Sequence, residues 1–231
     1  MVKKKKNEFK RNRLIAKLAP KSPITEQYRT IRTNIQFSAV DTPIRSLIVT
    51  SAGPSEGKST TASNLAVVFA QQGKKVLLVD SDLRRPTLHY TFGVTNTIGL
   101  TNVLTRQIHL NESIRETDVE NLYFMSSGPI PPNPTELLGS SSMDQLIGDL
   151  YEMFDLVLFD VPPVLAVADA QVMANQVDAS ILVISSGVTD RDGAIKAKEL
   201  LEQTKSKLLG AVLNNKEEDR TTHYYYYYSH K

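Results

Sequence analysis

The sequence predicts an α/β fold in which helices cover both faces of a doubly wound, mostly parallel sheet. Short apolar runs rich in β-branched residues are continuous rather than alternating, as is typical of strands that are buried on both faces. Helical patterns separate these runs, which favours repeated strand–helix–strand units. The length of 231 residues suits one domain with tails.

The predicted elements alternate along the chain. The first helix occupies residues 22–39 and begins at Ser22-Pro23, a favourable N-cap and first-turn pair. Its apolar residues share one face and are expected to pack on the domain: Ile24, Tyr28, Ile31 and Ile35. Strands are predicted at Ser46–Thr50, Lys75–Asp80, Asn121–Met125, Asp155–Asp160, Ser180–Ile184 and Leu208–Leu213. Later helices are predicted at Lys58–Gln72, Ser141–Tyr151, Ala168–Gln176 and Arg191–Lys205.

Composition excludes several classes of protein. The chain has no cysteine, which rules out disulfides, thiolate metal sites and iron–sulfur clusters. Its four histidines lack the spacing of zinc ligands, so a catalytic zinc site is not expected. Basic residues are not interleaved with aromatics, so we expect no specific nucleic-acid binding. No apolar run approaches the roughly 18 residues of a membrane span, and the basic start is not a secretory signal. We therefore expect a cytoplasmic protein.

Charge and composition divide the chain into three parts. Residues 1–21 form a basic segment, predicted to be a flexible arm that is either simply solvated or weakly attracted to an anionic membrane. Residues 22–215 form the predicted domain. Residues 216–231 form a polar tail that carries five consecutive tyrosines, Tyr224, Tyr225, Tyr226, Tyr227 and Tyr228. Neither a strand nor a helix could bury five aromatics in a row, so the block is either an adhesive patch or a set of phenols presented for chemistry.

A phosphate-binding loop is predicted between the first strand of the sheet and the helix that follows it. The residues that match this pattern or flank it are Gly53, Pro54, Ser55, Glu56, Gly57, Lys58, Ser59 and Thr60. Gly57 allows the backbone to approach phosphate, and amides at the helix start meet negative charge. Lys58 supplies a cation to the phosphate oxygens, and Ser59 can ligate Mg²⁺. Ala52 occupies the first glycine position of the general pattern.

Acidic residues end two of the predicted strands. Asp80 closes one strand, with Asp82 two residues further on, and Asp160 closes another. A single aspartate at a strand end is usually a turn residue or a helix cap. Because ligands bind at the carboxyl ends of strands in open α/β sheets, all three carboxylates are expected to converge on the phosphate loop. The sequence thus predicts a site for a magnesium–nucleotide complex.

With these motifs, the chain resembles the bacterial tyrosine kinases of the P-loop type that accompany capsule and exopolysaccharide synthesis. The resemblance extends from Ser22 to the end of the chain and implies a P-loop fold of the deviant Walker A, MinD-like superfamily. It is carried by Ala52–Ser59 as Walker A, Leu77–Asp82 as Walker A′, Leu156–Asp160 as Walker B, the segment Gly128–Leu138 and the terminal tyrosines. A further shared motif is the triplet Glu26, Arg29 and Arg32, which spacing alone would assign to a solvated helix face.

The resemblance implies specific roles and partners. Lys58 neutralises the transferred phosphoryl group; Ser59, Asp82 and Asp160 hold Mg²⁺; Asp80 accepts the phenol proton; and Asn214 recognises the adenine of ATP. Glu26, Arg29 and Arg32 become subunit contacts in a ring, an octamer by resemblance, whose tails enter neighbouring sites. A transmembrane activator that recruits the kinase to the inner face of the membrane, a cognate phosphatase and protein substrates such as sugar-nucleotide enzymes are also implied.

Two other functions compete with this interpretation. A partition or positioning ATPase of the same superfamily usually carries a second lysine early in the loop, where this chain has Ser51, Ala52 and Gly53. Such an ATPase would also leave the tyrosine block unexplained. A nucleotide-gated scaffold for polysaccharide assembly, with the tail as a docking patch, is the other alternative. Phosphotyrosine mapping separates the kinase from both.

Overall fold

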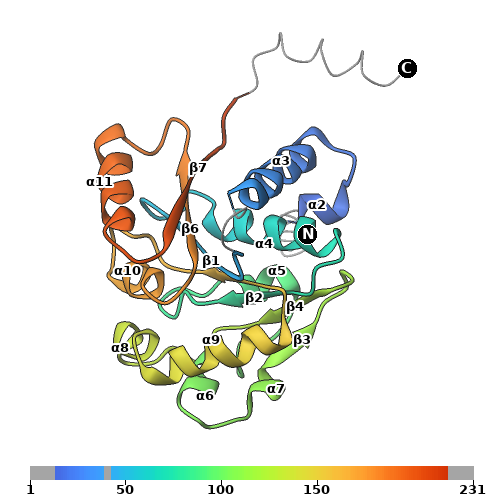
Figure 1. Ribbon diagram of the computed structural model, residues 1–231, viewed down its shortest axis with the longest axis vertical. Coiled ribbons are helices and arrows are strands. Elements are labelled where there is room, and N and C mark those ends of the chain that lie inside the picture. The colour runs from blue at the N-terminus through green and yellow to red at the C-terminus, as the bar shows by residue number, and fades with distance from the viewer. Residues whose placement is uncertain (1–13, 39–42, 218–231) are drawn as a thin grey trace, which may run out of the picture.

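The described residues, 14–38 and 43–217 of a computed structural model, form a seven-stranded sheet in the order β3-β4-β2-β5-β1-β6-β7 (Figure 1). Neighbouring strands are parallel throughout, except that β3 runs antiparallel to β4 at one edge. The predicted mostly parallel α/β fold is confirmed. The strands are β1 (Ser46–Ser51), β2 (Val76–Asp80), β3 (Ile114–Glu116), β4 (Leu122–Met125), β5 (Leu156–Asp160), β6 (Ala179–Ser185) and β7 (Lys207–Asn214).

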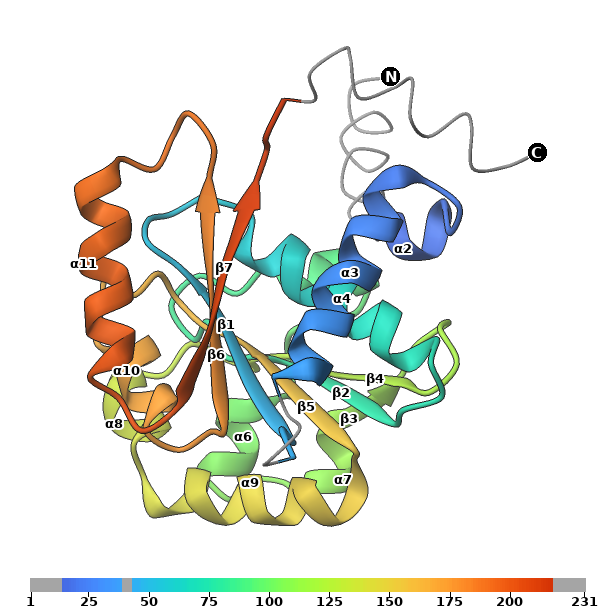
Figure 2. The same cartoon turned by 45° about the horizontal axis from the view of Figure 1, so that its top comes forward.

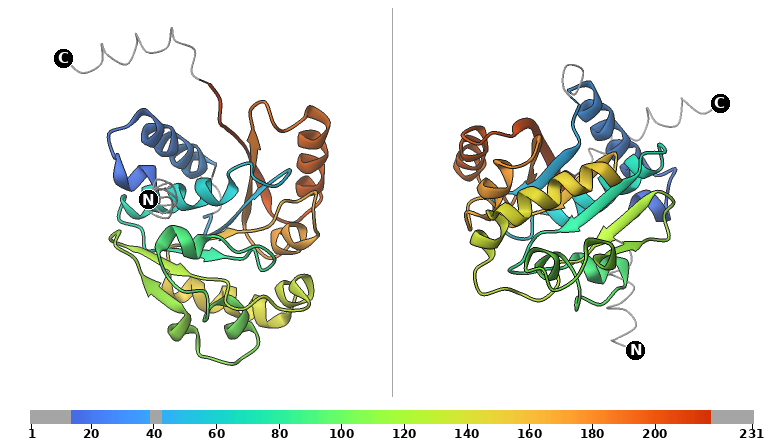
Figure 3. Two further views of the ribbon diagram at one scale, coloured as in Figure 1. Left: turned by 180° about the vertical axis from the view of Figure 1, so that it is seen from behind. Right: turned by 60° about the horizontal axis from the view of Figure 1, so that its bottom comes forward.

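Helices cover both faces of the sheet, as a doubly wound fold requires. On one face they share a core with Leu47, Val49 and Leu78, and these helices are α2 (Ile15–Leu18), α3 (Pro23–Phe37), α4 (Lys58–Ala70) and α5 (Leu88–Phe92). The other core contains Ile48 and Leu77 and is covered by α6 (Leu100–Leu104), α8 (Pro134–Leu138), α9 (Ser141–Met153), α10 (Asp169–Ala174) and α11 (Arg191–Glu202). The short α7 (Leu110–Ser113) leads into β3. In the right-hand view of Figure 3, α9 lies over one face of the sheet.

The three central strands determine where the site can form. Every residue of β1, β2 and β5 is buried, which explains their continuous apolar runs. In the pairing of β2 with β5, Asp80 lies directly beside Asp160. Because parallel strands end at the same edge of a sheet, this register brings both carboxylates to the edge where the loop after β1 also begins.

The predicted strands and long helices are confirmed to within a few residues, but the short elements were missed. These are β3 and five helices of four or five residues, α2, α5, α6, α7 and α8. Pro134 is the first residue of one of them, α8. The prediction that Ile24 packs on the domain was wrong, because its side chain is 48% exposed, whereas Tyr28 and Ile35 are buried as expected.

The described residues extend the packed domain to residue 14, on the N-terminal side of the predicted boundary at 22. Ala16 is fully buried, its backbone amide donates to Asn64 Oδ1 at 2.9 Å, and Gln71 Nε2 donates to its carbonyl at 3.1 Å. These bonds tie α2 to α4. Helix α2 has only four residues, too few to show a periodic pattern, so it was not predicted. Residues 1–13 of the expected basic arm lie outside the described residues.

Candidate nucleotide and phosphoryl-transfer site

The loop between β1 and α4 has the backbone of a phosphate cradle. Ser55 and Gly57 adopt positive φ angles of 64° and 97°. Gly57 is required on two counts, because its φ is left-handed and a Cβ atom there would lie 2.1 Å from Asn214 Nδ2. It is also the N-cap of α4, so the unpaired amides of the first helical turn, from Lys58 onward, are free to meet an anion.

Lys58 is held between two carboxylates at the carboxyl edge of the sheet. Its Nζ lies 2.9 Å from Asp82 Oδ2 and 3.3 Å from Asp160 Oδ1, and 3.3 Å from Ser59 Oγ. Burial acts to lower the pKa of Lys58, but Asp160 and Asp82 outweigh it and raise that pKa above its ordinary value. The predicted convergence of the strand-end acids on the loop lysine is therefore present in the structure.

Asp80 is a fully buried member of this cluster. Its Oδ2 accepts hydrogen bonds from the amides of Thr87 (3.1 Å) and Leu88 (3.0 Å), and its Oδ1 accepts one from the Asp82 amide (3.3 Å). Burial, reinforced by the charge of Asp160, raises the pKa of Asp80 to about 8, although the Leu88 amide and Lys58 oppose the shift. Asp80 can therefore exchange a proton near neutral pH.

Asp160 has unused capacity to bind a ligand. It is fully buried, and its Oδ2 has no hydrogen-bond partner among the described residues. Burial raises its pKa, while Lys58 and Ser59 lower it. Within 14–38 and 43–217, His, Asp and Glu side chains nowhere form a cage of three or more metal ligands. An open site with one or two carboxylates fits Mg²⁺, which usually binds through a few carboxylates, water and substrate phosphates.

Glu56 belongs to the loop, but its side chain faces inward and does not line the phosphate cradle. It is only 3% exposed; its Oε2 accepts from the Ala52 amide at 3.0 Å, and its Oε1 accepts from Thr189 Oγ1 at 2.7 Å. Thr189 in turn accepts a bond from the Ser185 amide at 2.8 Å. Glu56 thus braces the loop against the segment between β6 and α11, and sequence reasoning missed Thr189 because no motif includes it.

Asn214, at the end of β7, lies against the same loop. Its Nδ2 donates to the backbone carbonyl of Glu56 at 2.9 Å. Next to it, Asn215 donates to Ser185 Oγ at 3.0 Å. Among the other predicted loop residues, Pro54 and Ser55 are exposed, while Gly53, Ser59 and Thr60 are partly exposed. The structure therefore brings the predicted nucleotide residues to one edge of the sheet.

Comparison with known proteins identifies the family. The AAA domain family matches residues 47–209. The chain is 53% identical over 213 residues to the tyrosine-protein kinase YwqD of Bacillus subtilis, covering 92% of this chain and 90% of that protein. The chain belongs to the bacterial tyrosine-protein kinases. A crystal structure of the chimerical protein CapA2B2 superposes on the kinase with a TM-score of 0.87 at 43% identity, covering 90% of this chain and 91% of that one.

The positioning ATPases are more distant from this kinase. The septum site-determining protein MinD of Pyrococcus horikoshii, solved with Mg-ADP, matches it with a TM-score of 0.65 at 26% identity, covering 76% of this chain and 72% of that one. This likeness confirms the expected MinD-like P-loop fold. The lower similarity also separates the kinase from its principal rival in the same superfamily.

The predicted subunit-contact residues on α3 do not form a uniform outward stripe. Glu26 and Arg29 form an exposed ion pair, as their spacing suggested. Arg32 instead turns toward its own domain, where Nη1 donates to the Val68 carbonyl at 2.9 Å. That bond fixes part of the Arg32 side chain on α4. The terminal tyrosines, Tyr224–Tyr228, lie outside the described residues.

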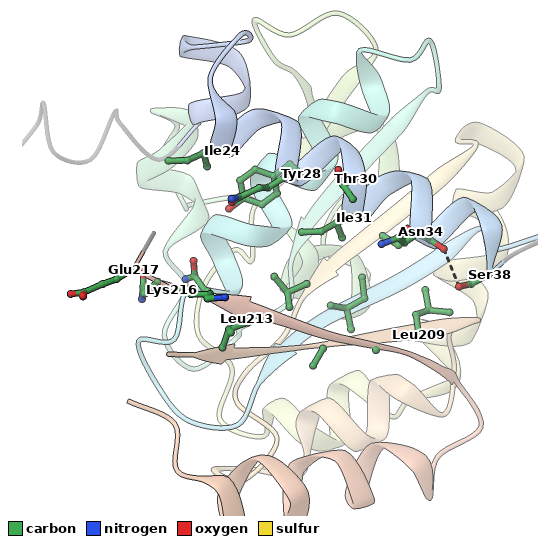
Figure 4. A pocket seen from close by; sticks show the side chains of 18 residues that line it. Ile24, Tyr28, Thr30, Ile31, Asn34, Ser38, Leu209, Leu213, Lys216 and Glu217 are labelled. Atoms are coloured by element: carbon green, nitrogen blue, oxygen red, sulfur yellow. Dashed lines mark hydrogen bonds between the residues drawn. The ribbon is translucent and has the colours of Figure 1, made fainter. Parts of the chain in front are cut away.

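Helix α3 and strand β7 lie near each other at one side of the molecule (Figure 2). A groove of about 790 Å³ lies between them (Figure 4). Apolar side chains line much of it, including Ile24, Ile31 and Leu213. Ile24 and Leu213 are 48% and 51% exposed. One end of the groove is formed by residues 214–217, so it opens beside the Asn214 contact with the phosphate loop.

Within 14–38 and 43–217, no helix is long and apolar enough to cross a membrane.

Proposed function

We propose that the protein is an ATP-dependent tyrosine kinase that phosphorylates its own Tyr224–Tyr228 between subunits, as well as tyrosines of other proteins. The placement of Lys58 between Asp82 and Asp160 carries this proposal. Phosphoryl transfer depends on positioning and on neutralising the charge of the transferred group, which a lysine and a metal held by carboxylates supply. Membership of the tyrosine-kinase family supports a phenol as the acceptor.

The residues of the site divide the work among them. Bound Mg²⁺ would offset the negative charge of the ATP phosphates. Ser59, Asp82 and Asp160 would hold it, directly or through water, and Lys58 would neutralise the oxygens of the transferred group. The tyrosine oxygen bonds to the γ-phosphorus as the bond from that phosphorus to the leaving ADP oxygen breaks. The phenol, whose pKa is near 10, gives its proton to Asp80.

The burial of Asp80 imposes a condition on this step. Both of its oxygens accept backbone amides, and its side chain is not exposed. The loop of residues 81–87 must therefore shift for a tyrosine to reach Asp80. Faster transfer as pH rises through about 8, with loss of that dependence in Asp80→Asn, would support Asp80 as the proton acceptor.

The nucleotide would lie along the loop between β1 and α4. We propose that backbone N–H groups between Gly53 and Thr60 hold the phosphates. Ser55 and Glu56 would contribute only through these N–H groups, and Pro54, which has none, would contribute only to the shape of the loop. Asn214 would read the adenine with its Oδ1, since its Nδ2 already donates to the loop. An Asn214→Ala variant is expected to bind ATP more weakly while discriminating less between ATP and GTP.

The subunits are proposed to assemble into a ring, an octamer by resemblance, through Glu26, Arg29 and Arg32. Each tail would enter the site of the next subunit. Because a phosphate adds about −1.5 to −2 charges, full modification of the tail adds roughly −8 to −10 and should favour disassembly. Equal ring populations, by sedimentation, for phosphorylated protein and a Tyr224–Tyr228→Phe variant would contradict this.

We propose that the cytoplasmic end of a transmembrane activator occupies the α3–β7 groove and recruits the kinase to the inner face of the membrane. The exposed Ile24 and Leu213 offer an apolar segment a place to bind, and the groove adjoins Asn214. Leu213→Asp should abolish binding of an activator peptide measured by calorimetry, whereas the exposed Val188→Asp, outside the groove, should not. Protein substrates such as sugar-nucleotide enzymes, a cognate phosphatase and control of capsule or exopolysaccharide synthesis complete the proposal.

Mass spectrometry tests the central claim. Full-length Lys58→Met protein serves as the acceptor and is mixed with Mg-ATP, activator peptide and wild-type kinase that lacks residues 216–231. Phosphate on Tyr224–Tyr228 of the acceptor is expected, because the only intact site and the only tail belong to different chains. No phosphate there, together with none on the wild-type protein alone, would favour the scaffold or ATPase alternatives.

A further inference from the structure

Arg84 makes a set of contacts that the proposed chemistry does not use. It lies two residues after Asp82, in the loop between β2 and α5. Its Nε donates to Asp169 Oδ2 at 2.8 Å, and its Nη2 donates to Asp169 Oδ1 at 3.0 Å. Nη2 also donates to Thr135 Oγ1 at 2.9 Å. Such bidentate arginine–carboxylate pairs are strong and fix orientation as well as distance.

The partners of Arg84 come from two other helices. Asp169 is the first residue of α10 and is fully buried, and Thr135 is the second residue of α8. The Thr135 hydroxyl donates to Asp169 Oδ1 at 2.5 Å. Gln176 of the segment after α10 also donates to the Leu138 carbonyl of α8 at 2.8 Å, so the two helices form one platform. The network joins residues 84, 135 and 169 on that platform.

The same loop carries the acidic part of the site. The Arg85 amide donates to Asp82 Oδ1 at 2.9 Å, while Lys58 holds Asp82 Oδ2. The Ser81 amide donates to the Asp160 carbonyl at 2.9 Å. The hydrogen bond to Asp169 raises the pKa of Arg84 above its ordinary value; burial opposes this shift, while the charge of Asp169 and, least of all, that of Asp82 add to it. Arg84 is thus the link from the platform to the loop that orients Asp82.

We propose that Arg84 and Asp169 are positioning residues of the kinase, whose bidentate pair holds the β2–α5 loop so that Asp82 faces Lys58 and the metal position. The inference rests on the proposed role of Asp82 in holding Mg²⁺. Residues that orient a metal's carboxylate ligands typically change metal affinity by about 10- to 100-fold when they are replaced.

The competing explanation is purely structural, because Arg84 also neutralises a buried carboxylate. An unpaired Asp169 would destabilise the fold whatever it did to the site. A double variant, Arg84→Met with Asp169→Asn, removes both charges and leaves no buried carboxylate to neutralise. Its melting temperature should therefore recover relative to Arg84→Met, while the loop stays unanchored.

The test measures ADP affinity by calorimetry in Mg²⁺ and in EDTA, together with the melting temperature of each full-length variant. The ratio of the two affinities reports the magnesium site. Arg84→Lys, which keeps the positive charge but cannot form the bidentate pair with Asp169, should lower this ratio about 10-fold. Affinity in EDTA should change less than about 2-fold, because phosphate-loop amides bind nucleotide without the metal. The double variant should keep the low ratio despite its recovered melting temperature.

Two further variants make the outcome decisive. Lys198→Met removes an exposed ion pair with Glu202 on α11 and should leave the ratio unchanged. Asp82→Asn should lower the ratio at least as much as Arg84→Lys; if it does not, the proposed metal role of Asp82 fails. If Asp82→Asn lowers the ratio but Arg84→Lys does not, or if the double variant restores it, the positioning role of Arg84 is overturned.

Discussion

Replacing Asp80 by asparagine should reveal how much the buried negative charge of Asp80 destabilises the kinase in the absence of nucleotide. In the folded protein Lys58 lies among three carboxylates, of which Asp80 and Asp160 are fully buried. Asparagine keeps an oxygen that can accept the Thr87 and Leu88 amides but carries no charge. We expect Asp80→Asn to gain stability relative to wild type as the pH is raised.

The magnitude follows from proton linkage. The pKa of Asp80 rises from 3.8 to about 8 on folding, so between these values the folded state binds more protons than the unfolded state. The stability linked to that proton is complete below the ordinary pKa and is lost as the pH rises toward 8. The loss is at most about 1.4 kcal/mol for each pH unit, or on the order of 4 kcal/mol from pH 5 to pH 8.

Urea denaturation at pH 5, 6, 7, 8 and 9 measures this effect. The wild type and Asp80→Asn are compared without nucleotide, and Asp149→Asn on the exposed side of α9 serves as the control. The free energy of unfolding of wild type should fall relative to that of Asp80→Asn as the pH rises, then level off above pH 8. A constant difference across the range, or one that changes equally in the Asp149 control, would refute the assignment of a raised pKa to Asp80.

Three further changes test the framework around the site. Gly57→Ala places a Cβ atom 2.1 Å from Asn214 Nδ2 at a φ of 97°, and should lower the free energy of unfolding in urea by about 1–3 kcal/mol. Adding Asn214→Ala should restore part of that loss. If it restores nothing, the contact with Asn214 is not the cause. Thr189→Val leaves Glu56 Oε1 without its partner and should cost about 1–3 kcal/mol and weaken ATP binding, whereas unchanged stability would show that Glu56 does not brace the loop. Tyr151→Phe removes the hydrogen bond between the Tyr151 hydroxyl and Ser46 Oγ at the amino end of β1. It should lower the free energy of unfolding by about 1 kcal/mol and leave kinase activity unchanged, because this end of the strand is remote from the site. Reduced activity at full stability would contradict this reasoning.

The parts of the site that the sequence predicted are those fixed by local patterns. Lys58 follows from a loop motif, and Asp80 and Asp160 follow from apolar runs that end in an acid. Each needs only its own neighbours to be recognised, and parallel pairing then brings them together. The shift of the Asp80 pKa could not be predicted, because it arises from complete burial and, after that, from the charge of Asp160.

The missed contributions depend on contacts between distant segments. Thr189 and Glu56 are 133 residues apart, and Arg84 and Asp169 are 85 apart, so no spacing rule points to either pair. The exposure of Ile24 was missed for a related reason. Helical spacing gives the apolar face of α3, but not how far the sheet extends beneath it, and the groove above β7 leaves that end uncovered.

The contact between Asn214 and the phosphate loop has a consequence for how the enzyme is made. Its two partners are 158 residues apart, and β7 is the last strand among the described residues. A ribosome therefore releases the loop well before it releases Asn214. The loop of a nascent chain lacks this brace until all of β7 has emerged, so the loop reaches its final support only after the sheet is complete.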